Sequence, residues 1–142
     1  MERTQATTRP IGLITAAIVV LTLTTAYIHL SLGGLLFALN AAGYAALALA
    51  MIAITALPHP IIRRFDWAPR IGLAGYAALT IGAYLVVGPY FTLGWVAKAI
   101  EIAVITLLVA DLRMGYGTPA ALVRSALASL GLGKGSRPVT VA

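Results

Sequence analysis

Long apolar runs separated by short polar stretches dominate this chain. Four of the runs approach or exceed the length of about 20 residues that an α-helix needs to cross a bilayer. They cover residues 11–30, 34–57, 69–87 and 93–112. Because no run shows the strict alternation of a half-buried strand, the pattern predicts an all-α fold, a four-transmembrane-helix bundle.

Proline and glycine mark the ends of the predicted helices. An uncharged turn at residues 31–34 separates the first two runs, and the second run ends at Pro58-His59-Pro60. Pro69 suits the first turn of a third helix, and Gly88-Pro89 closes it. The first run follows a basic segment, as in a signal peptide, but it is longer than a removable apolar region of about 7–15 residues. We therefore expect it to be retained as a membrane span.

A shorter amphipathic segment follows the bundle. Thr118-Pro119 is typical of a helix start, with a capping hydroxyl and a proline in the first turn. We expect residues 1–10 to form a cytoplasmic N-terminal segment, 11–113 the transmembrane domain, 114–131 an interfacial amphipathic helix and 132–142 a flexible tail. The predicted apolar face of the interfacial helix comprises Leu122, Val123, Ala126, Leu127 and Leu130, opposite Arg124, Ser125 and Ser129.

Composition supports a membrane location. Of 142 residues, 61% are hydrophobic and 10% are charged, against about 25% charged in ordinary soluble domains. A water-soluble enzyme is thereby disfavoured. The chain has no cysteine, which excludes disulfides, thiol catalysis and cysteine-ligated metals.

The basic residues predict the orientation. The formal charge is +6, and nine of the ten basic residues fall in the N-terminal segment, the middle connection or the C-terminal region. With four spans these parts share one side, so the positive-inside rule places both termini in the cytoplasm of a prokaryotic inner membrane. Anionic lipid head groups, and not nucleic acid, are the expected partner of this charge. The nine residues are Arg3, Arg9, Arg63, Arg64, Arg70, Arg113, Arg124, Lys134 and Arg137, of which Arg63, Arg64, Arg70, Arg113 and Arg124 are expected to face lipid.

Lys98 and Glu101 are ionisable residues inside the fourth span, where charge is costly and marks a candidate site. They are three residues apart, so they can meet on one helix face. A rise of about 1.5 Å per residue places Glu101 roughly 13 Å from Thr92, near the middle of the bilayer. The other helices carry polar residues at similar depth. The predicted intramembrane network comprises His29, Asn40, Tyr44, Tyr84, Lys98 and Glu101.

Several roles for this network remain open. A Lys–Glu pair completed by hydrogen bonds can fix helix register. Alternatively, Glu101 can carry protons or ions while Lys98 modulates its pKa. Ligand or lipid binding is a further interpretation, and Lys98 can also snorkel outward. No cofactor or metal is expected, because haem needs a second axial ligand and His59, the other histidine, belongs to the opposite side of the membrane.

Small residues at four-residue spacing predict close helix packing. One stripe lies on the second span and one on the third, opposite Tyr76, Thr80 and Tyr84. Of the two opposite faces of the third span, we expect one to pack inside the bundle and the other against a partner, either a second copy or a larger membrane complex. The stripes are Ala38, Ala42, Ala46 and Ala50, and Ala74, Ala78 and Gly82.

The segments HLSLGGLLFALNAAGYAAL and GWVAKAIEIAVITLLVADL resemble a group of small four-helix integral membrane proteins of bacteria and archaea. Trp95 stands where the group usually has tyrosine. The resemblance implies the four-helix fold and emphasises the same polar residues, but it implies no activity. The matching residues are His29, Gly34, Leu36, Phe37, Leu39, Asn40, Gly43, Tyr44, Gly94, Lys98, Ala99, Ile100 and Glu101.

No nucleophile–base triad, phosphate-binding loop or metal-spaced cluster supports an enzyme. The sequence therefore favours a non-catalytic structural or accessory component of a membrane assembly. The alternative is a small proton- or ion-coupled transporter that uses Glu101 and Lys98.

Overall fold

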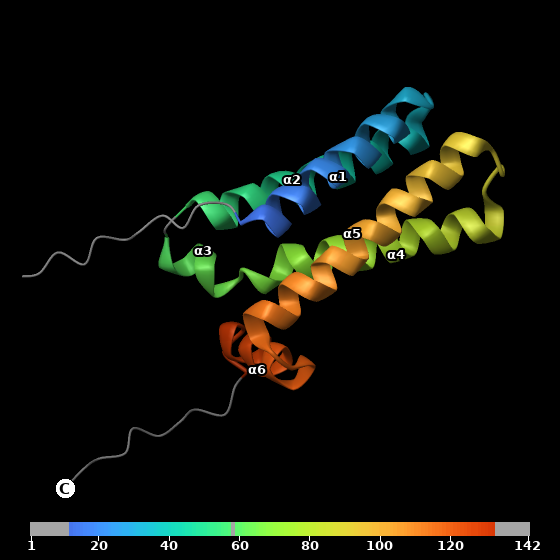
Figure 1. Ribbon diagram of the computed structural model, residues 1–142. Coiled ribbons are helices and arrows are strands. Elements are labelled where there is room, and N and C mark those ends of the chain that lie inside the picture. The colour runs from blue at the N-terminus through green and yellow to red at the C-terminus, as the bar shows by residue number, and fades with distance from the viewer. Residues whose placement is uncertain (1–11, 58, 133–142) are drawn as a thin grey trace, which may run out of the picture.

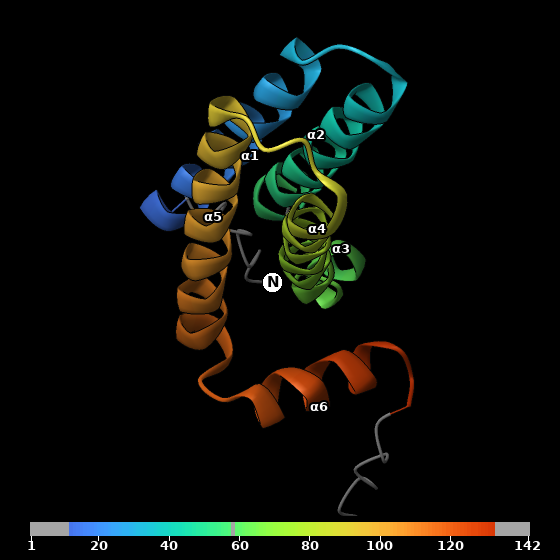
Figure 2. The same cartoon turned by 90° about the vertical axis from the view of Figure 1, so that its right-hand side faces the viewer.

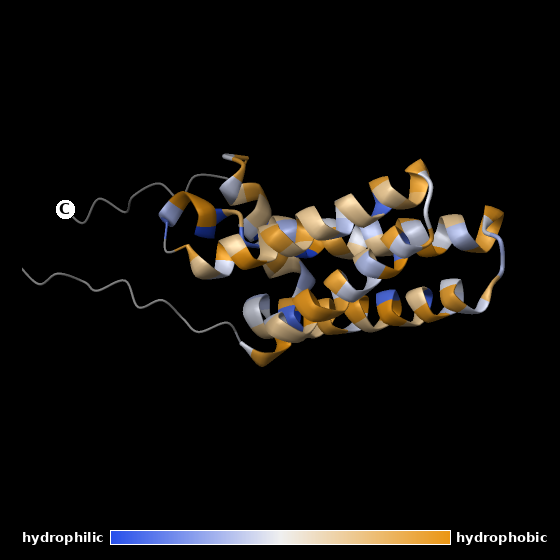
Figure 3. Ribbon diagram, turned by 90° about the horizontal axis from the view of Figure 1, so that it is seen from above, coloured by the Kyte–Doolittle hydropathy of each residue, from blue (hydrophilic) through white to orange (hydrophobic). Residues whose placement is uncertain are grey.

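A computed structural model describes residues 12–57 and 59–132, and this part of the chain forms six α-helices (Figure 1). Four of them are long and apolar enough to cross a membrane, which confirms the predicted all-α four-helix bundle and makes this a multi-pass membrane protein. Figure 3 shows that hydrophobic residues predominate along the long helices, with few hydrophilic positions. The helices are α1 (Leu13–Ser31), α2 (Leu35–Ala56), α3 (Pro60–Arg64), α4 (Trp67–Val87), α5 (Thr92–Tyr116) and α6 (Pro119–Ser129).

The four long helices form a ring in which each packs against two neighbours. Helix α1 contacts α2 and α5, and α4 contacts α5 and α2. The seam between α2 and α4 is the least closely packed of the four. In Figure 2 the short helix α6 lies across one end of the bundle, which we call the α6 end. The opposite end, which holds the α1–α2 turn and the α4–α5 loop, is called the turn end.

The two halves of the bundle have different interiors. In the half near the α6 end, Ile18, Met51, Leu73 and Leu108 are fully buried and form an apolar core. In the half near the turn end, the buried side chains include charged and hydroxyl groups. Polar groups inside a membrane are costly unless they are satisfied, so the second half is where a functional site is expected.

The predicted turn between the first two spans is confirmed. Helix α1 ends at Ser31 and α2 begins at Leu35. Gly33 and Gly34 have φ angles of 73° and 86°, in the region that favours glycine. The turn therefore reverses the chain within three residues.

The middle connection is more ordered than the sequence predicts. It contains the short helix α3, which starts at Pro60 after His59, whose ring accepts a hydrogen bond from the Ile61 amide. Helix α4 begins at Trp67, two residues before the expected start at Pro69, because proline is tolerated in the first turn of a helix. His59 is exposed, as predicted.

Helix α5 continues to Tyr116, three residues past the predicted boundary at residue 113. The extra turn carries the Tyr116 hydroxyl to Asp66, to which it donates a hydrogen bond. Gly117 then stops the helix with a φ of 72°. As predicted, Thr118 caps α6, and its hydroxyl accepts a bond from the Ala121 amide.

Helix α6 is held on the bundle by polar contacts. Trp67 donates its indole N–H to Ser129 Oγ at 2.9 Å, and Arg64 donates to the Ala128 carbonyl oxygen at 3.1 Å. Ser129 is therefore buried, and its prediction as part of the outward polar face with Arg124 is wrong. The sequence pattern does not show that the indole is available as a partner.

Arg70 is not the lipid-facing residue that was expected. Its Nε donates to Asp111 Oδ2 at 2.7 Å and its Nη1 donates to the Asp66 carbonyl oxygen at 2.6 Å. A guanidinium can serve both acceptors because its donors point in different directions. The other four members of the predicted lipid-facing set are exposed: Arg63, Arg64, Arg113 and Arg124.

Neither small-residue stripe forms the core. Ala42 and Ala46 on α2 are exposed, as are Ala78 and Gly82 on α4, whereas the buried alanines of these helices are Ala41, Ala48 and Ala77. On α4, Tyr76 and Thr80 contact the other helices inside the bundle while Ala78 and Gly82 are exposed, so the two faces of this helix differ as expected; packing of the exposed face against a partner stays a prediction. The predicted N-terminal segment and the tail from residue 133 lie outside the described residues, as do Arg3, Arg9, Lys134 and Arg137.

Candidate functional site

Lys98 and Glu101 form a buried ion pair on α5. The Lys98 ammonium lies 2.8 Å from Glu101 Oε1 and 2.6 Å from Oε2. Lys98 is 5% exposed and Glu101 is 0% exposed. Lys98 therefore points inward to its partner and does not snorkel toward the bilayer surface.

Helix α1 brings two more groups to the carboxylate. The Thr25 hydroxyl donates to Glu101 Oε1 at 3.4 Å, and His29 Nε2 lies 3.8 Å from the same oxygen. His29 Nδ1 is 2.8 Å from the carbonyl oxygen of Thr25. Because a carbonyl oxygen only accepts, Nδ1 carries a proton, and Nε2 is left to face the carboxylate.

Helices α4 and α2 complete the arrangement. Thr80 Oγ1 donates to Glu101 Oε2 at 2.9 Å, and the Tyr44 hydroxyl lies 2.6 Å from Thr80 Oγ1. One carboxylate is thus linked to all four long helices, through direct contacts on three of them and through Thr80 to α2. We call this group the charged centre; it comprises Thr25, His29, Tyr44, Thr80, Lys98 and Glu101.

Four of the six predicted network residues lie in the charged centre, and the other two form no hydrogen bond with it. The Tyr84 hydroxyl pairs with the backbone of Phe91, donating to its carbonyl oxygen and accepting from its amide, both at 3.2 Å. The backbone oxygen of Asn40 accepts a bond from Tyr76, while the buried Asn40 Oδ1 has no hydrogen-bond partner.

Sequence reasoning missed Thr25 and Thr80 as partners of the carboxylate. Each residue lies at helical spacing from a predicted network residue, Thr25 from His29 and Thr80 from Tyr84. Threonine in a membrane helix usually bonds its own backbone, as Thr22 does with the Ile18 carbonyl oxygen and as Thr80 also can with that of Ala77. Residue type and spacing alone do not separate these two cases.

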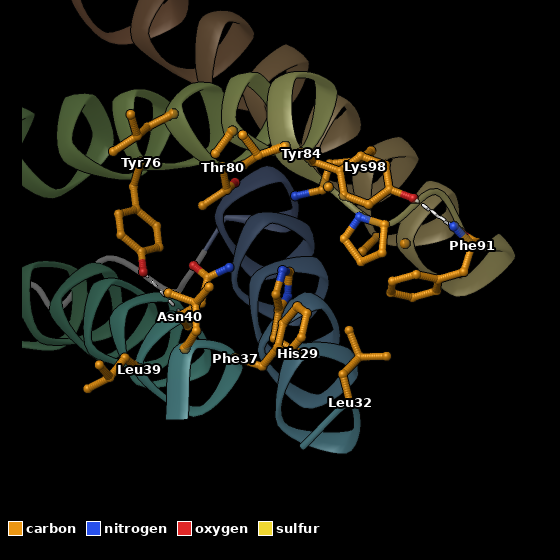
Figure 4. Close-up of a pocket in the computed structure, with 18 residues that line it drawn as sticks. His29, Leu32, Phe37, Leu39, Asn40, Tyr76, Thr80, Tyr84, Phe91 and Lys98 are labelled. Atoms are coloured by element: carbon orange, nitrogen blue, oxygen red, sulfur yellow. Dashed lines mark hydrogen bonds between the residues drawn. The ribbon is translucent and has the colours of Figure 1, made fainter. Parts of the chain in front are cut away.

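A cavity of about 360 Å³ opens between α2 and α4 beside the charged centre (Figure 4). Such a volume lies in the range of small-molecule sites, roughly 300–1,000 Å³. Lys98, His29 and Thr80 face it from the charged centre, and Asn40 projects into it from α2. The rest of the wall is mainly apolar or aromatic.

An aromatic cluster closes the turn end of this cavity. The Tyr84 ring stands edge-on to Trp95 at 5.4 Å and to Phe91 at 6.3 Å. A Cβ atom at Gly94 would lie 2.5 Å from the Tyr84 hydroxyl, so only glycine leaves room for this ring. The Lys98 ammonium lies 5.6 Å from the centre of the Tyr84 ring, within the range of a cation–π contact.

The charged centre is sealed on its other side. Ile18, Met51, Leu73 and Leu108 are 0% exposed and separate it from the α6 end. Thr22, also buried there, is bonded to its own helix backbone. In this conformation the site is therefore approached from the cavity and not from the α6 end.

The described residues include no group of three or more histidine, aspartate or glutamate side chains placed to hold a metal ion. His29 lies near the turn end and His59 near the α6 end, so the two imidazoles stand at opposite ends of the bundle. The arrangement offers a neutralised ion pair, a histidine and an unpaired amide oxygen beside an apolar cavity. These groups can bind a ligand or relay a proton.

Comparison with known proteins gives no functional assignment. The chain matches no protein-family model, no curated protein sequence and no solved structure. Its function is therefore argued from the charged centre and the cavity.

Proposed function

We propose that this multi-pass protein is a non-catalytic structural or accessory component of a membrane assembly, and that its charged centre fixes the four spans in one register. The observation that carries the proposal is the coordination of the Glu101 carboxylate. Both of its oxygens are satisfied within the chain, by Lys98, Thr25 and Thr80.

Internal satisfaction supports a structural role over a chemical one. A buried charge without a partner is strongly destabilising, whereas a paired and hydrogen-bonded charge can specify how helices align. Here the donors come from α1, α4 and α5, so a shift of any of these helices breaks a bond to the carboxylate. No competing acceptor or donor has to arrive from outside for the pair to be stable.

The proposed topology places the α6 end in the cytoplasm of a prokaryotic inner membrane. Exposed Arg63, Arg64, Arg113 and Arg124 lie on the segments at this end, where they can meet anionic head groups. The loops of the turn end carry no lysine or arginine. The positive-inside rule therefore supports this orientation.

The assembly is tested by gentle purification of a tagged chain from its native membranes. We expect wild-type protein to elute with a stoichiometric membrane partner or as a defined oligomer. The variant Lys98→Leu/Glu101→Leu should lose this assembly, while Thr106→Leu, an exposed threonine on the same helix, should keep it. Elution of the wild type as a single chain without partners contradicts the proposal.

A second candidate function is proton- or ion-coupled transport. Lys98 and His29 line the cavity and lie beside Glu101 inside the spans, and ionisable groups within spans are typical of proton and ion pathways. Reconstituted protein should then move protons down an imposed gradient, read with a pH-sensitive dye in the vesicle lumen. Loss of flux in the Lys98→Leu/Glu101→Leu variant, with assembly retained, favours the transporter. Absence of flux in the wild type favours the accessory role.

A further inference from the structure

Asn40 lines the cavity between α2 and α4 and carries an unsatisfied acceptor, which bears on the chemistry of what the cavity can hold. Asn40 Oδ1 is buried and has no partner, although an unpaired buried acceptor costs about 1–3 kcal/mol. Lys98 has three N–H donors and its two contacts with Glu101 account for two of them. The residues that line the cavity therefore include one unpaired acceptor on α2 and, on α5, one N–H donor that Glu101 does not use.

The charges of the cavity are already balanced. The Lys98 ammonium is neutralised by Glu101, so an anionic ligand would compete with a carboxylate held at 2.6 Å. A cationic ligand would meet the same ammonium. A neutral polar head that carries both a donor and an acceptor, such as a hydroxyl group, suits these groups best.

The walls favour a flat ring. Phe37, Tyr76, Tyr84 and Phe91 line the cavity together with the His29 imidazole (Figure 4). Aromatic side chains pack edge-to-face or offset against other rings, with a gain beyond simple burial. A planar ring therefore fits this enclosure better than a branched head group.

The opening of the cavity faces the membrane interior. Leu36, Leu39, Leu79 and Val87 line it and are 60–80% exposed. They lie on α2 and α4, the two helices that pack least closely together. An apolar tail attached to the ring can leave through this seam into the acyl chains.

We propose that the cavity binds a phenolic lipid, meaning a neutral membrane-soluble molecule with a hydroxyl-bearing ring and an apolar tail. The ring hydroxyl donates to Asn40 Oδ1 and accepts from Lys98 Nζ, the ring packs among the aromatic side chains, and the tail passes between α2 and α4. This binding site goes beyond the accessory role and does not depend on it.

The test uses 4-heptylphenol as the probe, with full-length protein in lipid nanodiscs. Heptylbenzene has the same tail but lacks oxygen, and 4-heptylanisole keeps an acceptor but lacks the donor. Saturable binding is measured from the shift of the unfolding midpoint and from quenching of tryptophan fluorescence, since Trp95 packs against Tyr84 of the cavity wall. We expect the phenol to bind roughly tenfold more tightly than the anisole, which loses one hydrogen bond, and more tightly still than heptylbenzene, which loses both.

Variants locate the site. Asn40→Leu should remove the preference for the phenol over the anisole, and Ala83→Phe, which fills the cavity, should abolish saturable binding. Ala78→Phe is the matched control, because Ala78 is an exposed alanine on the same helix that does not line the cavity.

Three results would overturn the proposal. They are equal binding of the three probes, which indicates an acyl-chain cavity only; no saturable binding of the phenol; and unchanged binding in Ala83→Phe. The comparison of the three probes on wild-type protein holds even if a variant fails to fold. Failure of this test leaves the membrane assembly unaffected, since that is measured without any probe.

Discussion

The hydroxyl groups of Tyr44 and Thr80 lie 2.6 Å apart and join α2 to α4 at the charged centre. Thr80 has a single hydroxyl proton and lies 2.9 Å from Glu101 Oε2. Thr80 Oγ1 is also 2.9 Å from the Ala77 carbonyl oxygen, which like the carboxylate only accepts, so the Thr80 proton goes to one of these two acceptors and Tyr44 must donate to Thr80. When Thr80 donates to Glu101, the two hydroxyls form a directed chain ending on the carboxylate. The seam between α2 and α4, the least closely packed of the four, is thus linked to Glu101 by hydrogen bonds.

Removal of the Tyr44 hydroxyl should loosen this seam. Tyr44→Phe keeps the ring between His29 and Tyr76 but loses the bond to Thr80, so we expect a loss of about 1 kcal/mol in the free energy of unfolding. The measurement is denaturant-induced unfolding in mixed micelles. Tyr27→Phe is the control, because Tyr27 is 72% exposed, and an equal loss in both variants contradicts the prediction.

Substitutions of Lys98 and Glu101 should be strongly non-additive. Lys98→Met or Glu101→Met alone leaves its former partner without a counter-charge and should cost about 3–5 kcal/mol. The double variant Lys98→Met/Glu101→Met removes both charges and should cost less than the sum of the single losses. A double-mutant cycle on unfolding free energies checks this, and additive losses would show that the pair does not interact.

Arg70 should not be replaceable by lysine. Its guanidinium reaches Asp111 with Nε and the Asp66 carbonyl oxygen with Nη1, and one ammonium on a flexible stem cannot hold both in the same geometry. We expect Arg70→Lys to lower the unfolding free energy by roughly 1–2 kcal/mol. The control Arg113→Lys, at an exposed position, should stay within about 0.5 kcal/mol of wild type. Equal stability of the two variants would show that the Arg70 contacts contribute nothing.

The docking of α6 should depend on Trp67. Trp67→Phe keeps an aromatic ring but removes the N–H that bonds Ser129, so α6 should separate from α4 and α5 more often. Hydrogen exchange of residues 119–129 measures this and should become faster in the variant, with the rest of α5 unchanged. Trp95→Phe, at the far end of the bundle, is the control. Unaltered exchange in Trp67→Phe would show that other contacts hold the helix.

Both termini should lie in the cytoplasm. A fluorescent protein that matures only in the cytoplasm should be bright when fused to either end, and a phosphatase that needs export should be inactive there. Fusion of the phosphatase within the loop at residues 88–91 should make it active. Phosphatase activity at either terminus would contradict the proposed topology.

The sequence by itself determined the elements and their environment. Four apolar runs, ended by glycine and proline, specify four spans because a bilayer admits only helices whose backbone bonds are satisfied internally. The Thr118-Pro119 start of α6 and the Gly33-Gly34 turn were also readable, since capping hydroxyls and positive φ angles are local properties. The same reasoning predicted Lys98 and Glu101 as a pair, because three-residue spacing fixes one helix face.

Only the tertiary structure decided which polar groups meet. Thr25 and Thr80 reach Glu101, whereas Asn40 and Tyr84 line the cavity, because helix rotation and the packing of neighbouring helices set these distances. Arg70 and Ser129 turn inward for the same reason, since their partners Asp111 and Trp67 are 41 and 62 residues away in the chain. A sequence pattern indicates which face of a helix is polar or apolar. Which of these faces contact one another is decided only when the helices pack.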